Sequence, residues 1–277
     1  MYFQTLMRSC FFLCRILGMF PYKINNSIIE VSKPHFILSI MIICGICIFE
    51  LTYEFDIFTQ ANFMTITKSF QLIFICILIN FLSITTLVFS NSRMRLLQTI
   101  MHVSSRLSPK SYQKLSRLFH TKDIFGFFCL SGLFCLYIFK NAYDTLHLIF
   151  LIYLDLLILQ LQMLYMNCVC IIKACFKEIN NNLLHMKKLV ANNEPHVLMM
   201  FYYQKRNPFL IMKLKALEKQ HMMISNTVQM LNTTFSLQIL TTILTVFLQI
   251  IIESFINLVQ WHNGFVINLE KVGEVFL

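Results

Sequence analysis

The sequence has little charge and little glycine. Only 13% of its 277 residues are charged and six are glycine, whereas 57% are hydrophobic and 28 are phenylalanine. The charged share is about half that of a soluble domain, and a water-soluble fold of this size cannot hide so much apolar surface. Disordered tails, collagen-like rods and ordinary cytosolic enzymes are therefore excluded. Long apolar runs without strict alternation argue against an outer-membrane barrel, which leaves an all-α integral membrane protein.

The sequence also lacks the motifs of catalysis and of cofactor binding. It contains no HExxH, GxGxxG, phosphate-loop or GxSxG pattern, and its eight histidines never fall at the close spacing of a metal-binding box. The pair Cys44-x-x-Cys47 lies inside an apolar run, where packing is favoured over zinc binding. We therefore expect no catalytic residue, no metal ion and no cofactor.

Five apolar segments approach the roughly 20 residues that a helix needs to cross about 30 Å of hydrocarbon. They predict membrane spans at residues 36–53, 70–90, 124–139, 146–172 and 235–260. The stretch 11–20 is too short to span and carries Arg15. We interpret it as an amphipathic or buried segment at the start of the chain.

The basic residues gather on one side of these spans. Twenty of the 23 Lys and Arg residues precede the first span, separate the second from the third, or separate the fourth from the fifth. Such a side is cytoplasmic by the positive-inside rule, so the amino terminus is predicted to be cytoplasmic. The formal net charge of +10 then reflects topology and contact with acidic membrane lipid, and no nucleic-acid partner is expected.

This topology predicts five consecutive regions. They are a cytoplasmic segment at 1–35, four spans within 36–172 with a cytoplasmic loop at 91–123, a cytoplasmic helical extension at 173–234, a fifth span at 235–260, and a short extracellular tail at 261–277.

A heptad-like apolar stripe precedes the fifth span. Pro208 stands where a helix can begin, and the spacing of threes and fours predicts a helix that continues unbroken into the membrane. A seam of this length is typical of contacts between subunits, and packing within one chain explains it equally well. The candidate subunit-contact residues are Leu210, Leu214, Leu217, Ile224, Val228 and Leu231.

A few polar side chains fall inside the predicted spans, where burying an ionisable group is costly. Together with tyrosines in the outer halves of the spans, they are suited to a ligand pocket that opens to the outside. Hydrogen bonding between helices, without any ligand, is the alternative. The candidate ligand-binding residues are Tyr137, Tyr153, Asp155, Gln249 and Glu253.

Two stretches resemble the insect gustatory receptor family, which is related to the insect odorant receptors. The first runs from Phe12 to Tyr22, with Gly18, Phe20, Pro21 and Tyr22 as its core. The second precedes and enters the fifth span, and comprises His221, Leu231, Asn232, Phe235, Ser236, Gln238 and Leu240. The resemblance covers roughly residues 11–260.

The resemblance implies a bundle of seven spans with a cytoplasmic amino terminus, assembled as a tetrameric ligand-gated cation channel in the plasma membrane. It implies a ligand pocket among helices two to six, a pore lined by the seventh helix, and an anchor domain of cytoplasmic helix extensions. The family's Thr-Tyr…Gln-Phe motif, carried by its last helix, is missing here. We therefore expect five of the seven spans, in an incomplete copy that lacks the pore helix.

Three functions remain open at this point. The first is a gustatory receptor subunit that senses a small-molecule tastant, in a homo- or hetero-tetramer with related receptor subunits. The second is a non-conducting fragment, or an interacting partner of full-length subunits. The third is an unrelated membrane transporter, which is disfavoured because no proline interrupts the predicted spans.

Overall fold

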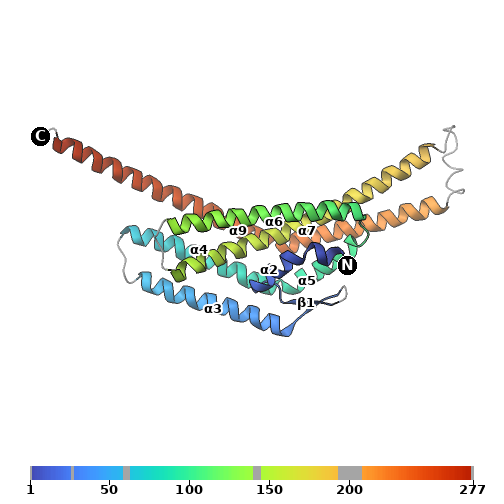
Figure 1. The fold of residues 1–277 in the computed structure, drawn as a ribbon, viewed down its shortest axis with the longest axis horizontal. Coiled ribbons are helices and arrows are strands. Elements are labelled where there is room, and N and C mark those ends of the chain that lie inside the picture. The colour runs from blue at the N-terminus through green and yellow to red at the C-terminus, as the bar shows by residue number, and fades with distance from the viewer. Residues whose placement is uncertain (1, 26–27, 59–62, 140–144, 193–207, 276–277) are drawn as a thin grey trace. The chain divides into compact units, whose positions relative to one another are not determined.

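The structure, a computed structural model, describes residues 2–25, 28–58, 63–139, 145–192 and 208–275. Long helices dominate these residues (Figure 1). The helices are α1 (Tyr2–Leu6), α2 (Arg8–Ile16), α3 (Lys33–Phe58), α4 (Phe63–Val88), α5 (Ser90–Ser104), α6 (Pro109–Phe139), α7 (Thr145–Asn192) and α9 (Pro208–Val275). The strands β1 (Tyr22–Asn25) and β2 (Ile28–Val31) complete the described chain.

The chain forms two compact units. The first unit comprises Met1–Ile40 and Leu87–Ser236, and the second unit comprises Met41–Thr86 and Leu237–Leu277. Helices α3, α4 and α9 each contribute residues to both units. Each unit is described by itself below.

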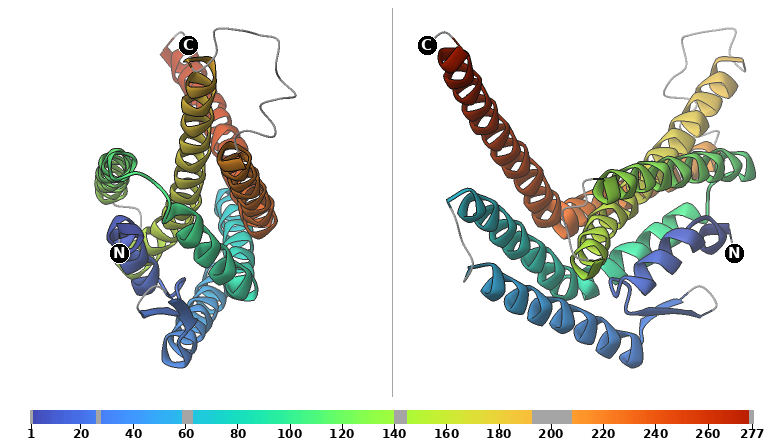
Figure 2. Two further views of the ribbon diagram at one scale, coloured as in Figure 1. Left: turned by 90° about the vertical axis from the view of Figure 1, so that its right-hand side faces the viewer. Right: turned by 60° about the vertical axis from the view of Figure 1, so that its left-hand side comes forward.

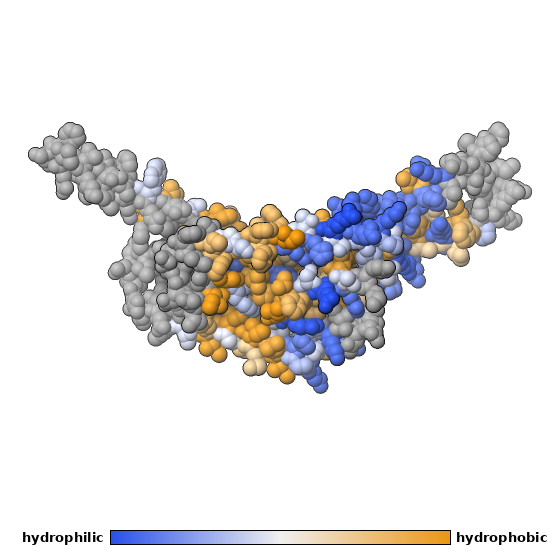
Figure 3. All heavy atoms as spheres, viewed as in Figure 1, coloured by the Kyte–Doolittle hydropathy of each residue, from blue (hydrophilic) through white to orange (hydrophobic). Residues whose placement is uncertain are grey.

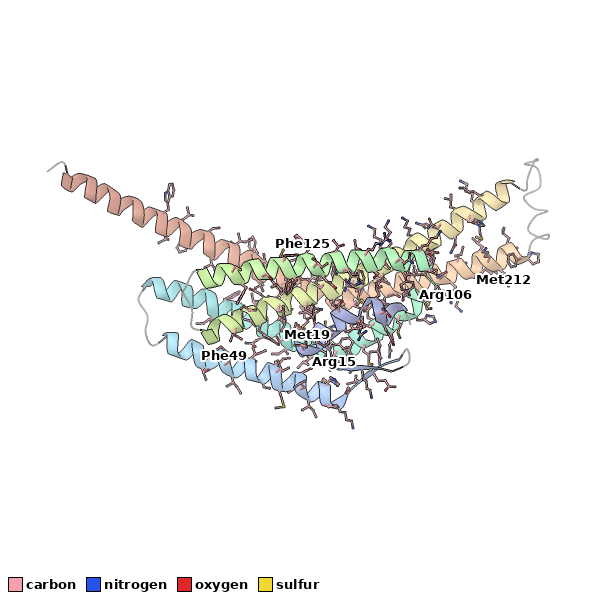
Figure 4. All side chains as sticks on the ribbon, viewed as in Figure 1. Arg15, Met19, Phe49, Arg106, Phe125 and Met212 are labelled. Atoms are coloured by element: carbon pink, nitrogen blue, oxygen red, sulfur yellow. The ribbon has the colours of Figure 1, made fainter. Side chains whose placement is uncertain are left out.

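Helix α2 ends in a tight turn at Gly18. Gly18 has a φ of 71°, which side chains with a Cβ rarely adopt. Its N–H donates to the carbonyl of Arg15 at 3.1 Å, and the N–H of Met19 donates to the carbonyl of Cys14 at 2.8 Å. These two bonds form a Schellman motif, which satisfies the last carbonyls of the helix. The turn redirects the chain at the carboxyl end of α2, where Arg15 and Met19 lie (Figure 4).

A β-hairpin follows the turn, where no strand is expected from the sequence. Strands β1 and β2 pair antiparallel, with Tyr22 opposite Val31 and Lys23 opposite Glu30. The side-chain amide of Gln98 in α5 donates to the carbonyl of Ile29 at 2.6 Å, which attaches the hairpin to a helix. The hairpin leads directly into α3 (Figure 2). The expectation of an all-α fold is therefore corrected by one short two-stranded sheet.

Helix α7 is at the centre of the first unit's core. It contacts α2, α5 and α6. The side chains of one face are buried at helical spacing, because an amphipathic helix turns the same face inward every three or four residues. They are Leu154, Leu157, Leu161, Leu164, Cys168, Ile171 and Cys175. Helix α6 approaches α7 closely at Gly126, where an added Cβ would lie 2.7 Å from the Met163 methyl carbon.

The buried residues of the second unit are mostly polar, unlike the mostly apolar ones of the first unit. Among its described residues, Leu82 is a buried large apolar side chain, and the other buried residues carry hydroxyl or amide groups. These polar residues are Ser83, Thr85, Thr86, Gln238, Thr241, Thr242 and Thr245. Its exposed side chains include many large apolar ones, such as Ile77 on α4 and Phe247 on α9.

Each predicted span falls on a helix, except that the second predicted span ends two residues beyond α4. Two helical stretches of the described chain are long and apolar enough to cross a bilayer, Ile152–Lys188 and Pro208–Ile252. They overlap the fourth and fifth predicted spans. The total of five spans and the cytoplasmic amino terminus stay predictions.

The third predicted span is the second half of α6. Hydrophilic residues gather around the amino-terminal part of this helix, and hydrophobic residues around its middle (Figure 3). Exposed apolar side chains become frequent at Ile124, and Phe125, Phe127 and Phe128 are each more than two-thirds exposed. Phe125 is labelled on the outer side of α6 in Figure 4. Exposed phenylalanines in succession are typical of a surface that faces lipid.

Candidate functional site

The apolar stripe on α9 divides into buried and exposed members. The helix begins at Pro208 and continues without a break into the fifth predicted span, so that prediction is confirmed. Leu217, Ile224 and Leu231 are buried within the chain, whereas Leu214 is 49% exposed. Packing within one chain thus occupies part of the stripe. Contact with other subunits through the six candidate residues of the stripe stays a prediction.

The amino-terminal segment packs against α7 through specific hydrogen bonds. The side-chain amide of Gln160 donates to the carbonyl of Cys10 at 3.0 Å, and its nitrogen lies 3.2 Å and 3.4 Å from the sulfurs of Cys10 and Cys14. The Tyr153 hydroxyl donates to the carbonyl of Leu17 at 3.0 Å. The expectation that residues 11–20 include buried positions is confirmed, since Cys14 and Leu17 are buried.

The family-like motif after α2 forms an aromatic cluster. The rings of Phe11 and Phe20 stack with centroids 4.5 Å apart, and Tyr22 meets Phe20 edge to face at 4.7 Å. The Tyr22 hydroxyl donates to the backbone carbonyl of Ser90 at the start of α5. Burial raises the pKa of Tyr22 to about 12, although Arg93 and the bond to Ser90 act in the opposite direction. Tyr22 therefore stays protonated at neutral pH.

Residues Tyr22, Ser90, Arg93 and Phe235 bring together β1, α5 and α9, and we call this place the Arg93 junction. Arg93 is completely buried. Its guanidinium carbon lies 5.7 Å from the centroid of Phe235 on α9, which itself packs on Tyr165 of α7 at 5.5 Å. Among the described residues none accepts a hydrogen bond from its three guanidinium nitrogens. Burial lowers the pKa of Arg93, while Tyr22 and Cys14 oppose this shift. Burying an arginine without a hydrogen-bonded partner is unfavourable, so Arg93 requires a specific explanation.

A second cation, Lys122, has hydrogen-bond acceptors on α7. The Lys122 ammonium donates to the carbonyl of Met163 at 3.2 Å and to the side-chain oxygen of Asn167. It also lies 5.2 Å from the Phe119 ring centroid, within the range of a cation–π contact. Partial burial lowers the pKa of Lys122, and the neighbouring Asp123 opposes the shift. The fold thus provides acceptors for the partly buried Lys122, in contrast to Arg93.

In the second unit, polar groups connect neighbouring helices. The amide of Gln238 on α9 donates to the Thr86 hydroxyl on α4 at 3.1 Å, and the Cys47 thiol on α3 donates to the Asn80 side-chain oxygen at 3.0 Å. Cys47 thus serves in helix packing. The residues that the structure describes contain no group of three His, Cys, Asp or Glu side chains that could hold a metal ion.

The candidate ligand-binding residues fall in both units. Tyr153 and Asp155 lie half-buried on α7 in the first unit, and Gln249 lies half-buried on α9 in the second. The side chains of Tyr137 and Glu253 lie outside what the structure describes. The hydroxyl of Tyr153 is bound to Leu17. A ligand pocket built from these five residues stays a prediction.

The junction around Arg93 was not predicted from the sequence. Arg93 counts there only as one of the basic residues of the predicted cytoplasmic loop 91–123, and a charge count gives no information on burial. The motif of Gly18, Phe20, Pro21 and Tyr22 was the available signal, and the structure shows that these residues end α2 and bring Tyr22 to the start of α5. Chemically, the junction holds helices together and presents the Arg93 guanidinium, which has no hydrogen-bond acceptor within the described ranges.

Comparison with known families identifies the chain. The family model described as 7tm chemosensory receptor matches residues 7–271. The chain therefore belongs to the 7tm chemosensory receptor family, which confirms the resemblance at the level of the family. Membership supports a helical membrane protein with a role in chemoreception, and this family is not an enzyme family. No curated protein and no solved structure matches the chain.

Proposed function

We propose that this chain is an insect gustatory receptor subunit, part of a ligand-gated cation channel that senses small-molecule tastants. The family match over residues 7–271 carries this proposal. The order of the two family-like stretches, around Gly18–Tyr22 and around Phe235–Gln238, supports the gustatory assignment. The receptor acts in the plasma membrane with a cytoplasmic amino terminus, and it has no catalytic step.

The physical basis of gating in this proposal is a population shift. A tastant opens the channel only if it binds the open arrangement more tightly than the closed one. Asp155 is the proposed polar contact in the first unit, because it lies half-buried in a helix predicted to span the membrane. Substituting it should move the concentration that gives a half-maximal response.

The Thr-Tyr…Gln-Phe motif is absent from the 277 residues. The proposal therefore assigns the pore to a helix outside these residues or to related subunits of a tetramer. Expressing the chain with a complete related subunit should then give tastant-dependent cation current, while the 277 residues alone should give none.

The decisive experiment compares Asp155→Asn with Glu218→Gln in that co-expression system. Glu218 is exposed on the part of α9 predicted to be cytoplasmic, so Glu218→Gln should leave the response to each tastant unchanged. Asp155→Asn should shift the half-maximal tastant concentration at equal surface expression. Unchanged responses for both variants would remove Asp155 from the pocket, and silence at full expression, across a broad tastant panel, would reject the receptor proposal.

The alternative is a non-conducting partner of full-length subunits. It is favoured by exposed apolar side chains near the start of α9, where Phe209, Met212 and Leu214 are each at least 49% exposed although this region is predicted to be cytoplasmic. Co-purification with a full-length related subunit, without any tastant-dependent current, would support it. Leu214→Glu should abolish the co-purification, and the neighbouring exposed change Lys215→Glu should not.

A further inference from the structure

Arg93 combines complete burial with complete lack of hydrogen-bond partners among the described residues. Its side chain is 0% exposed, and none of its three nitrogens has an acceptor. A guanidinium presents five N–H donors in a fixed fork that matches anions. Buried charges in proteins are nearly always paired and hydrogen-bonded, so the donors of Arg93 indicate an acceptor that the chain itself does not provide.

The groups that act electrostatically on Arg93 are the phenol of Tyr22 and the thiols of Cys14 and Cys168, and no carboxylate is among them. The hydrogen bond with Cys10 lowers the pKa of the Cys14 thiol, and Arg93 adds to that shift. Burial raises the pKa of Tyr22 to about 12, so its phenol carries no charge at neutral pH. The thiol of Cys14 is near Gln160, and its sulfur does not accept a hydrogen bond from the guanidinium.

We propose that Arg93 is the centre of an anion-binding site for a small monovalent inorganic ion of the size of chloride. The ring of Phe235 lies 5.7 Å from the guanidinium carbon, and Tyr22, Cys14 and Cys168 act on the charge electrostatically. Because the Tyr22 hydroxyl already donates to Ser90, the site offers one positive charge and few other polar donors, which suits a monovalent anion of the size of chloride.

The burial of the site restricts the size of the ion. Arg93, Tyr22 and Phe235 are each at most 1% exposed, and Leu96 and Leu97 on the same helix as Arg93 are also fully buried. A phosphate attached to a lipid would need an open path from the membrane surface to the guanidinium. A monatomic anion needs only a transient local opening.

The site also has a structural role in the first unit. Arg93 lies on α5, Tyr22 on β1 and Phe235 on α9, so three segments distant in the sequence meet at one charge. A bound anion would stabilise the packing of these segments because it binds the folded chain and not the unfolded chain. This inference does not rest on the proposed receptor function, and its test requires no tastant.

The experiment is thermal unfolding of the purified full chain in neutral-lipid nanodiscs. Sodium chloride is compared with sodium gluconate at equal ionic strength, from 1 to 300 mM. We expect the unfolding temperature in chloride to exceed that in gluconate by about 5 °C at saturation, with a hyperbolic dependence on concentration. Bromide should act as chloride does, because the site selects for size and charge.

Two variants assign the effect to Arg93. Arg93→Gln should abolish the difference between chloride and gluconate, whereas Arg95→Gln, on an exposed residue two positions along the same helix, should retain it in full. If Arg93→Gln does not fold, Arg93→Lys keeps the charge but loses the fork, and should weaken chloride binding about tenfold. Line broadening of the chloride-35 NMR signal by the wild-type chain, but not by Arg93→Lys at the same concentration, gives a second readout.

Several results would overturn the proposal. The first is an equal unfolding temperature in chloride and gluconate for the wild-type chain. The second is a chloride effect that survives in Arg93→Gln. The third is stabilisation by vesicles or nanodiscs containing phosphatidylserine, lost in Arg93→Gln, without any effect of chloride, which would make the partner a lipid headgroup.

Discussion

In the first unit the described buried side chains are mainly large and apolar, whereas in the second unit they are mainly hydroxyls and amides. Leu164 and Ile224 represent the first kind, and Thr241 and Gln238 the second. On the outer surface the second unit is rich in apolar residues such as Phe247 and Ile250. Helix α9 thus buries mainly apolar side chains in the first unit and mainly polar side chains in the second.

This difference in buried side chains indicates which solvent surrounds each unit. Burying apolar groups stabilises a fold only if the alternative is water. In hydrocarbon that gain disappears, and helices are held by close packing and by hydrogen bonds between hydroxyl and amide groups. The second unit fits a lipid surrounding, and the first unit, with charged residues such as Lys110 and Lys187 outside its core, fits a surrounding that includes water.

The largest expected effect comes from removing a buried phenylalanine of α9, with an exposed phenylalanine of the same helix as the control. Phe235→Ala should lower the free energy of unfolding by about 3–5 kcal/mol, because Phe235 is 1% exposed and packs on Tyr165 and Arg93. Phe247→Ala should change it by less than about 0.5 kcal/mol, because Phe247 is 59% exposed. Chemical or thermal unfolding in nanodiscs measures both, and equal losses would contradict the contrast between the units.

The next effect concerns the hydroxyl of Tyr22. Tyr22→Phe removes the bond to the carbonyl of Ser90 and should cost about 1–3 kcal/mol. The same variant should change the dependence of stability on pH. The folded chain retains the Tyr22 proton up to a pKa of about 12, whereas the unfolded chain loses it near pH 10.

Stability of the wild-type chain should therefore fall between pH 10 and 12, where the unfolded state binds fewer protons than the native state. In Tyr22→Phe this decrease should be smaller. The difference between the two unfolding curves isolates Tyr22 from the other tyrosines, and parallel curves would show that Tyr22 titrates normally in the folded chain.

A smaller effect is expected from two glycines, one in each unit. Gly18→Ala should cost about 1–2 kcal/mol, because Gly18 has a φ of 71° and closes α2. Gly45→Ala should stabilise α3 by about 0.5–1 kcal/mol, since nothing lies within 4 Å of the added Cβ. Unfolding temperatures of the two variants, relative to the wild type, should move in opposite directions.

The smallest effect tests the polar contact of the second unit. A double-mutant cycle with Gln238→Leu and Thr86→Val should give a coupling free energy of about 0.6 kcal/mol, the average for hydrogen bonds between membrane helices. The cycle is measured by unfolding in nanodiscs. A coupling near zero would mean that packing alone holds α4 and α9 together.

The sequence was sufficient to predict the long helices and the start of α9 at Pro208. Apolar runs and a proline at the first helical turn are local signals, and they depend on no distant residue. The hairpin at Tyr22–Val31 was missed because strands of four residues carry a weak pattern. The interior of the first unit was missed for a different reason, since Tyr22 reaches Ser90 and Gln160 reaches Cys10 across long stretches of chain.

The candidate site illustrates the same limit. Asp155 and Gln249 stand out in the sequence because they are polar within apolar runs, yet nothing local indicates which side chains they meet. Arg93 is the reverse case, because it looks like an ordinary loop arginine and is completely buried. Charge patterns predict the side of the membrane on which a segment lies, and they do not predict which charges the fold encloses.

The length of helix α9 has a consequence for the topology. It runs for 68 residues from Pro208 to Val275 without a break, a length of about 100 Å. Its residues belong to both units, because the first unit ends at Ser236 and the second resumes at Leu237. One uninterrupted helix therefore connects the predicted cytoplasmic extension to the fifth predicted span, with no loop between them.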